Sequence, residues 1–294
     1  MPRSIKGKIV LITGCSSGFG LHMAAHLASC GCQVIATMRN LEKQSALLNE
    51  VQRRGGQVEV MQLDVTDKSS IKATIKQIAV KHGHLDVLVN NAGYGLGGFF
   101  EDLSDNEIRG VMETNFFGVQ NVTREVIPLM RQRKHGKIIN ISSVSGFSAS
   151  PAFSAYNASK WALEGFSESL RYELGFFGID VLLIEPGIYK TKIFYENSRY
   201  AANFENSNSP YFDVSRYLRE MVMNNVNDCH KDIEEVPLLV EKLIRAVNPS
   251  FRNIPDIESK IQYIFRKMLP FSIYSWIVQT VLLSKLKSLK KDNL

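Results

Sequence analysis

A tyrosine and a lysine four positions apart, with a serine upstream, are the residues in this chain best suited to chemistry. Tyr156 and Lys160 fall on one face of a predicted helix over residues 154–177, and Ser143 stands thirteen positions before the tyrosine. A phenol titrates near pH ~10, so the Lys160 ammonium could favour its ionised form. The Ser143 hydroxyl could hold a carbonyl or hydroxyl beside the phenol. This set could move a proton on an oxygen while another group moves a hydride.

The N-terminal segment has the pattern of a site for a hydride carrier. Residues 8–12 form an apolar run suited to a buried parallel strand, and residues 18–29 have a helical pattern. Glycines between them permit a tight turn against a pyrophosphate, and the helix N-terminus offers free N–H groups. The spacing is G-x-x-x-G-x-G rather than G-x-G-x-x-G, so a glycine loop without a ligand is the alternative. The turn reads Thr13-Gly14-Cys15-Ser16-Ser17-Gly18-Phe19-Gly20.

Together these motifs make the chain resemble the short-chain dehydrogenase/reductase family over about residues 5–192. The family's order and approximate spacing are followed by residues 13–20, Asn90-Asn91-Ala92-Gly93, Asn115, Ser143, Tyr156 with Lys160, and Pro186 to Thr191. Residues 12–20, 36–39 and 63–65 look like the branch that contains 17β-hydroxysteroid and retinol dehydrogenases.

The resemblance implies four catalytic residues. Tyr156 would be the general acid/base, and Lys160 would lower the phenol's pKa and bind the nicotinamide ribose. Ser143 would orient the substrate oxygen, while Asn115 would hold a water in a proton relay near the lysine. Ser142 competes with Ser143, but the thirteen-residue spacing matches the family and favours Ser143.

The end of the second predicted strand, 33–37, indicates which nicotinamide cofactor binds. An acidic residue there would accept hydrogen bonds from the adenosine ribose and select NAD, but the chain reads Thr37-Met38-Arg39-Asn40. The planar guanidinium of Arg39 could pair with a 2′-phosphate. We therefore predict NADP(H), with NAD(H) and a merely solvated Arg39 as the alternatives.

The remaining cofactor contacts follow from the resemblance. Asp64 would meet the adenine amine with Val65 against the ring, and the segment after Pro186 would meet the nicotinamide. Tyr189 departs from the smaller apolar residue common at its position. The predicted cofactor-binding residues are Gly14, Ser16, Ser17, Gly18, Phe19, Gly20, Arg39, Asp64, Val65, Asn91, Ala92, Gly93, Tyr156, Lys160, Pro186, Gly187, Ile188 and Thr191.

Alternating apolar runs and amphipathic stretches predict an α/β fold: a single-domain Rossmann-type, doubly wound parallel sheet with helices on both faces. Near residues 253–256 a seventh strand has a weak signal. The predicted strands are 8–12, 33–37, 58–63, 85–90, 137–142 and 179–184, and the predicted helices are 18–29, 41–53, 68–82, 104–131 and 154–177.

Two later segments break the alternation. Residues 192–235 are rich in Asn, Ser, Tyr and Phe, which favours a lid over an apolar substrate rather than an ordinary surface loop. Residues 261–294 read as an amphipathic C-terminal extension with several lysines. It could close the substrate pocket, form a dimer surface or lie on a membrane.

Composition narrows the class of protein. A length of 294 residues with 45% hydrophobic and 22% charged residues suits one domain, residues 1–294, with a sizeable core. The net charge is +6, yet no nucleic-acid module is recognisable. The four cysteines show no metal-ligand spacing, and the start of the chain has no apolar signal segment, so we expect reduced thiols and a cytoplasmic protein. His22 and His26 are four apart but lack a third ligand, so we expect no metal site.

The sequence therefore predicts an NAD(P)-dependent alcohol dehydrogenase or carbonyl reductase for an apolar, steroid-like or retinoid-like substrate, working as a homodimer or homotetramer. Two alternatives stay open. One is a non-catalytic dinucleotide-binding sensor on the same fold. The other is a 3-oxoacyl-thioester reductase of the same family.

Overall fold

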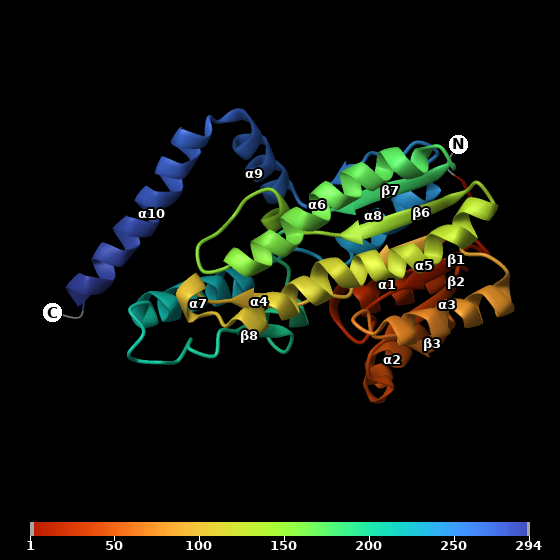
Figure 1. Cartoon of the computed structure of the whole chain (residues 1–294), viewed down its shortest axis with the longest axis horizontal. Coiled ribbons are helices and arrows are strands. Elements are labelled where there is room, and N and C mark those ends of the chain that lie inside the picture. The colour runs from red at the N-terminus through yellow and green to blue at the C-terminus, as the bar shows by residue number, and fades with distance from the viewer. Residues whose placement is uncertain (1–2, 293–294) are drawn as a thin grey trace.

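A seven-stranded, all-parallel sheet forms the centre of the computed structural model, which describes residues 3–292 (Figure 1). The strand order is β3-β2-β1-β4-β6-β7-β9. The order reverses between β1 and β4, which is the switch point where ligands bind in open α/β sheets. This arrangement confirms the predicted Rossmann-type fold. The strands are β1 (Ile9–Ile12), β2 (Gln33–Met38), β3 (Val58–Gln62), β4 (Val87–Asn90), β6 (Gly136–Ile141), β7 (Ile179–Ile184) and β9 (Arg252–Asn253).

Helices cover both faces of the sheet because successive strand residues point to opposite sides. Val10 and Ile12 of β1 join the core under α1 (Gly18–Ser29), α2 (Ser45–Arg53) and α8 (Glu235–Arg245). Ile9 and Leu11 join the core on the other face, under three further helices. A strand buried on both faces reads as a continuous apolar run, which explains the clear signal in the sequence. The second set is α3 (Lys68–His82), α5 (Gly118–Gln132) and α6 (Ser154–Gly175).

The predicted helix 104–131 is divided. It begins with a capping box between Ser104 and Glu107, continues as α4 (Asp105–Met112), passes through a π-helical turn at Glu113–Phe117 and resumes as α5. A π-turn has the same apolar spacing over a few residues as an α-helix, so periodicity does not detect it. The turn places Asn115 in the interior.

A second, two-stranded parallel sheet lies beside the first. It joins β5 (Gly95–Gly97) to β8 (Ser198–Tyr200), which precedes α7 (Phe212–Asn227). Both strands are three residues long, which is too short for a recognisable pattern, and neither was predicted. Short 3-10 turns occur at Leu41–Gln44, Phe100–Asp102, Val144–Gly146 and Lys192–Phe194.

The C-terminal segment forms two helices rather than one extension. α9 (Ile257–Met268) and α10 (Phe271–Asp292) are separated at Leu269 and Pro270, where proline disfavours a helical residue before it. α9 packs against the loop after β6, with the rings of Tyr263 and Phe147 edge to face at 5.1 Å. α10 extends away from the rest of the molecule (Figure 1). The last two residues of the predicted 261–294 extension lie outside the described residues.

No helix among residues 3–292 is both long and apolar enough to cross a membrane. The weakly predicted seventh strand exists, but at Arg252–Asn253 rather than 253–256, where it pairs with Leu183 and Ile184 of β7. Two residues are too few to give a period-2 pattern, which is why the sequence marked this strand so faintly.

Candidate active site

Two close contacts in the turn after β1 leave no room for a side chain and so require glycine. Gly14 has a φ of 74°, and a Cβ there would lie 2.8 Å from Cα of Ala92. A Cβ on Gly20 would lie 2.3 Å from the Gly14 carbonyl oxygen. Only glycine fits either position, and the N-terminus of α1 follows with no acidic residue in its first turn. The free N–H groups of that turn can bind an anion such as a pyrophosphate.

The same turn is tied to the loop after β4. The Thr13 hydroxyl accepts hydrogen bonds from the backbone N–H groups of Asn91 and Ala92, at 3.0 and 3.1 Å. The Asn91 amide donates to the carbonyl oxygens of Thr13 and Gly14, at 2.9 and 3.1 Å. These four bonds make two of the predicted cofactor loops one unit.

A cleft of about 370 Å³ runs along these loops. Its lining includes Met38 and Leu63, which are buried apolar residues at the ends of β2 and β3. The open cradle, its size and the anion-binding turn fit a dinucleotide. The cleft is lined by twelve of the predicted cofactor-binding residues: Gly14, Ser16, Ser17, Gly18, Phe19, Arg39, Asp64, Val65, Asn91, Ala92, Gly93 and Thr191.

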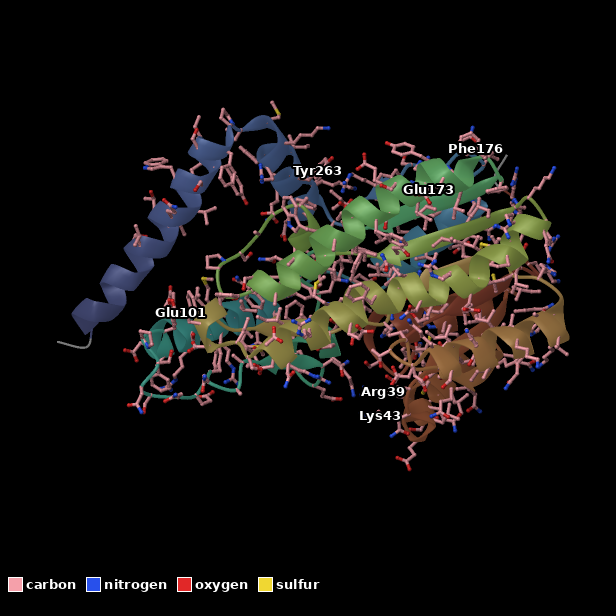
Figure 2. All side chains as sticks on the ribbon, viewed as in Figure 1. Arg39, Lys43, Glu101, Glu173, Phe176 and Tyr263 are labelled. Carbon is pink, nitrogen blue, oxygen red and sulfur yellow. The ribbon has the colours of Figure 1, made fainter. Side chains whose placement is uncertain are left out.

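Two cations line the β2 end of the cleft. Arg39 follows the strand, and Lys43 comes from the 3-10 turn Leu41–Gln44 (Figure 2). No acidic side chain follows β2 directly, so this end of the cleft favours an anionic group. The sequence analysis missed Lys43, although a second basic residue four positions after Arg39 was a usable signal.

A smaller cavity of about 90 Å³ adjoins the cleft and shares Phe19, Gly93 and Thr191 with it. It lies where β6 and β7 end. The structure thus brings most of the predicted catalytic and nicotinamide-end residues to one place. The cavity is lined by Ser143, Tyr156, Lys160, Pro186 and Gly187, and also by Ser142. Three predicted residues, Gly20, Asn115 and Ile188, line neither space.

The surroundings of Tyr156 favour the protonated form of its phenol. Burial raises its pKa above the ordinary value, and the Ser143 hydroxyl acts in the opposite direction. The Lys160 ammonium lies 5.9 Å from the centre of the tyrosine ring, but it donates to the Ile141 carbonyl at 2.9 Å. The net shift of the phenol's pKa is upward because desolvation outweighs the effect of the Ser143 hydroxyl, and the lowering expected from Lys160 stays a prediction.

Lys160 sits above a buried group of charges. Its side chain is 7% exposed, and burial lowers its pKa to about 8 while Glu164 opposes that shift. The Glu164 carboxylate shares Arg252 with Glu185, which pairs with that guanidinium at 2.6 Å. Burial raises the pKa of both carboxyl groups.

This charged group was missed in the sequence. Two weak signals existed: Glu164 is four residues after Lys160 on the same helix, and Glu185 directly precedes Pro186. The sequence around Arg252 has no such signal, because this residue lies on the two-residue strand β9. The site thus depends on a residue from the last part of the chain.

The Asn115 side chain is fully occupied by protein partners. It exchanges two hydrogen bonds with the backbone of Tyr94, both at 3.0 Å, and donates to the Ser159 hydroxyl at 3.1 Å. These bonds fix the start of the loop that carries β5. The predicted water relay at Asn115 stays a prediction.

The segment around β8 closes over the cofactor cleft. The Asn197 amide donates to the Ser17 hydroxyl at 3.0 Å, and the Arg199 guanidinium lies 4.3 Å from the centre of the Tyr94 ring. Both Asn197 and Arg199 line the cleft and were absent from the predicted site. Further on, Tyr200 packs in a small apolar cluster that includes Tyr156.

Tyr189 stands where a smaller apolar residue is common in the family, and it packs beneath the glycine turn. Its ring meets that of Phe19 edge to face at 5.3 Å, and its hydroxyl donates to Glu235 at 2.6 Å. The side chain is 1% exposed. The larger residue is thus anchored to α8 by its hydroxyl.

A doubly wound parallel sheet, with a glycine-rich cleft and an adjoining Ser-Tyr-Lys cavity at the ends of its strands, is the arrangement of an oxidoreductase of the Rossmann type. The sequence profile of the short chain dehydrogenases matches residues 8–201. The chain belongs to this family of oxidoreductases, and it resembles the steroid and retinol dehydrogenase branch.

Similar proteins match over most of their length. A 3-ketodihydrosphingosine reductase from Bacteroides thetaiotaomicron is 36% identical over 88% of this chain and 91% of its own. Retinol dehydrogenase 8 from Bos taurus is 37% identical over 83% of this chain and 79% of its own. A solved short-chain dehydrogenase from Streptomyces avermitilis has a TM-score of 0.79 and 30% identity, covering 95% of this chain and 98% of its own. Among other similar structures, one holds NADPH and another NAD.

Proposed function

We propose that this protein is an NADP(H)-dependent carbonyl reductase that converts an apolar ketone or aldehyde to its alcohol. One observation carries the proposal: the Tyr156 phenol lines a small cavity together with Ser143 and Lys160, and this cavity adjoins the dinucleotide cleft. A proton donor next to a hydride site is what carbonyl reduction needs.

The residues divide the work as follows. A bound reduced nicotinamide supplies the hydride that forms the new C–H bond at the carbonyl carbon. Ser143 donates a hydrogen bond to the carbonyl oxygen and so holds it beside Tyr156. Tyr156 gives its proton to the oxygen as negative charge develops there, which yields the alcohol. Lys160 stands next to the phenol and stabilises the phenolate that is left.

Cofactor preference is proposed to come from two cations. Arg39 and Lys43 line the β2 end of the cleft, where the adenosine ribose of a dinucleotide lies in this fold. A 2′-phosphate would find two positive charges there, whereas a free ribose would find no directly adjacent carboxylate. NAD(H) is the alternative.

The substrate is proposed to be apolar and bulky. Tyr94, Ile193 and Phe194 line the small cavity together with Tyr156, and the aromatic segment 192–235 would act as the lid. The similar proteins are named for a long-chain amino ketone and for retinol. An acyl-thioester substrate and a non-catalytic sensor stay as the alternatives.

The test is initial-rate oxidation of NADPH and of NADH with a panel of retinal, steroid ketones, 3-ketodihydrosphingosine, aliphatic aldehydes and acetoacetyl thioester. A signal with one apolar carbonyl class that Tyr156→Phe abolishes supports the proposal. Activity confined to the thioester would replace the substrate class. Tight NADPH binding without turnover of any compound would favour the sensor.

We also propose that α10 lies on a membrane surface near the source of an apolar substrate. Ile273, Trp276 and Ile277 lie on one face of this helix and are 41–65% exposed, and Arg266 and Lys267 precede the helix. Such a helix suits the boundary between headgroups and acyl chains. The protein should float with anionic liposomes in a density gradient, and Trp276→Glu should reduce the fraction of protein that floats. Dimer formation through the same face, detected by light scattering without lipid, would instead make it a subunit contact.

A further inference from the structure

Three side chains with metal-binding atoms converge at the C-terminal end of α1. His26 lies in the last turn of that helix, Cys30 directly follows the last helical residue, and Glu241 reaches them from α8. His26 Nε2 lies 2.7 Å from the Glu241 carboxylate. Cys30 Sγ lies 3.8 Å from that ring nitrogen and 3.7 Å from the same carboxylate. None of the three lines the cofactor cleft or the small cavity.

These separations resemble the edges of a tetrahedral zinc site. With Zn–S near ~2.3 Å and Zn–N or Zn–O near ~2.1 Å, a tetrahedron has edges of about 3.6 Å between sulfur and either lighter atom, and about 3.4 Å between nitrogen and oxygen. The two sulfur edges match those found here. The nitrogen–oxygen edge is shorter because the ring and the carboxylate share a hydrogen bond, which a metal ion would replace.

The surroundings also suit a metal centre. The second oxygen of Glu241 accepts a hydrogen bond from Arg245 at 2.7 Å, which orients the carboxylate as outer partners of metal ligands do. The side chains of His26 and Glu241 are 14% and 18% exposed, so an ion and one water can reach them. His22, the other histidine of the predicted pair, is engaged with Glu234 at 3.0 Å and is not part of the group.

We propose that His26, Cys30 and Glu241 bind Zn²⁺, with water as the fourth ligand. Binding converts the Cys30 thiol to a thiolate and releases its proton to solvent, while His26 binds as the neutral imidazole. The thiolate and the carboxylate together balance the two charges of the ion. The site joins α1, whose other end begins the dinucleotide turn, to α8. Its role is therefore to fix the helix that presents the cofactor site, not to take part in the reaction.

The experiment is titration of the metal-free, full-length protein with Co²⁺ in the absence of competing thiols. One equivalent should produce a thiolate-to-cobalt charge-transfer band in the near ultraviolet and the intense visible bands of a four-coordinate ion, and Zn²⁺ should remove both. Cys30→Ser should lose the charge-transfer band. His26→Gln and Glu241→Gln should each weaken binding at least about tenfold, as loss of one ligand implies.

Matched variants separate this site from the other thiols and from folding defects. Cys32→Ser, Cys229→Ser and His22→Gln should keep the spectrum, and Zn²⁺ should raise the melting temperature of these variants but not that of Cys30→Ser. Circular dichroism without metal checks that each variant is folded. No charge-transfer band in the wild type, or one that survives Cys30→Ser, would overturn the proposal.

Discussion

The two halves of the molecule differ in how they are built. From β1 to β6, buried apolar strands alternate with amphipathic helices, and the cofactor cleft lies on loops bonded to one another, as between Thr13 and Asn91. Beyond β7, the elements are short strands and helices whose positions depend on distant contacts, such as Asn197 with Ser17. In the function that we propose, the first half binds the dinucleotide and the second half adapts the site to a substrate. The predictions below test that division.

Tyr156→Phe should have the largest effect, because it removes the proton donor at the junction of the halves. We expect carbonyl reduction to fall by about 10²–10⁴-fold, the usual contribution of an acid or base, with NADPH binding unchanged. Initial rates and fluorescence titration with NADPH measure the two. Tyr172→Phe, on an exposed face of the same helix, is the matched control and should keep full activity. An active Tyr156→Phe enzyme would place the proton donor elsewhere.

Arg39→Ala tests the first half alone. Hydrogen bonds to charged groups contribute about 1.5–3 kcal/mol, so the dissociation constant for NADPH should rise by about 10–100-fold while that for NADH stays nearly constant. Lys43→Ala should give a smaller change of the same kind. Arg53→Ala, an exposed cation on α2, serves as the control. Equal losses for both nucleotides would remove Arg39 from a phosphate site.

Asn197→Ala tests whether the second half acts on the first. The variant loses the hydrogen bond to Ser17, which is worth about 0.5–1.5 kcal/mol, so binding of either nucleotide should weaken by up to about tenfold. The ratio of NADPH to NADH affinity should not change, because Asn197 is not one of the cations at the β2 end. A changed ratio in isothermal titration would show that β8 helps to choose the cofactor.

Glu185→Gln should have the smallest effect, on stability and its pH dependence. Burial raises the pKa of Glu185, so the folded protein holds an extra proton between the ordinary carboxyl pKa and the raised one. Wild-type stability should therefore fall as pH rises through that interval. The variant should match the wild type at a pH below the interval and be the more stable of the two proteins above it. Thermal melts across pH measure both, and parallel curves for the two proteins would contradict the assignment.

The difference between the halves also explains what the sequence could predict. Strands such as β1 and the motifs around Gly14, Ser143 and Tyr156 are local patterns, so their places followed from residue types and spacing. Lys160 could be found in the same way, but the net direction of the shift in the Tyr156 pKa could not, because burial is set by the whole fold. Arg252 contacts Glu164 and Glu185, each of which lies at least 67 residues before it in the chain. No local sequence pattern predicts contacts between residues so far apart.

Arg252 is synthesised long after the residues that it neutralises. Glu164 and Glu185 leave the ribosome first, and until β9 pairs with β7 the two carboxylates have no guanidinium and the edge of β7 has no partner strand. Burying them at that stage would cost more than leaving them hydrated. The nascent chain therefore carries Ser143, Tyr156 and Lys160 before it can enclose them. Pairing of β9 with β7 brings the guanidinium to these carboxylates and covers the edge of β7 at the same time.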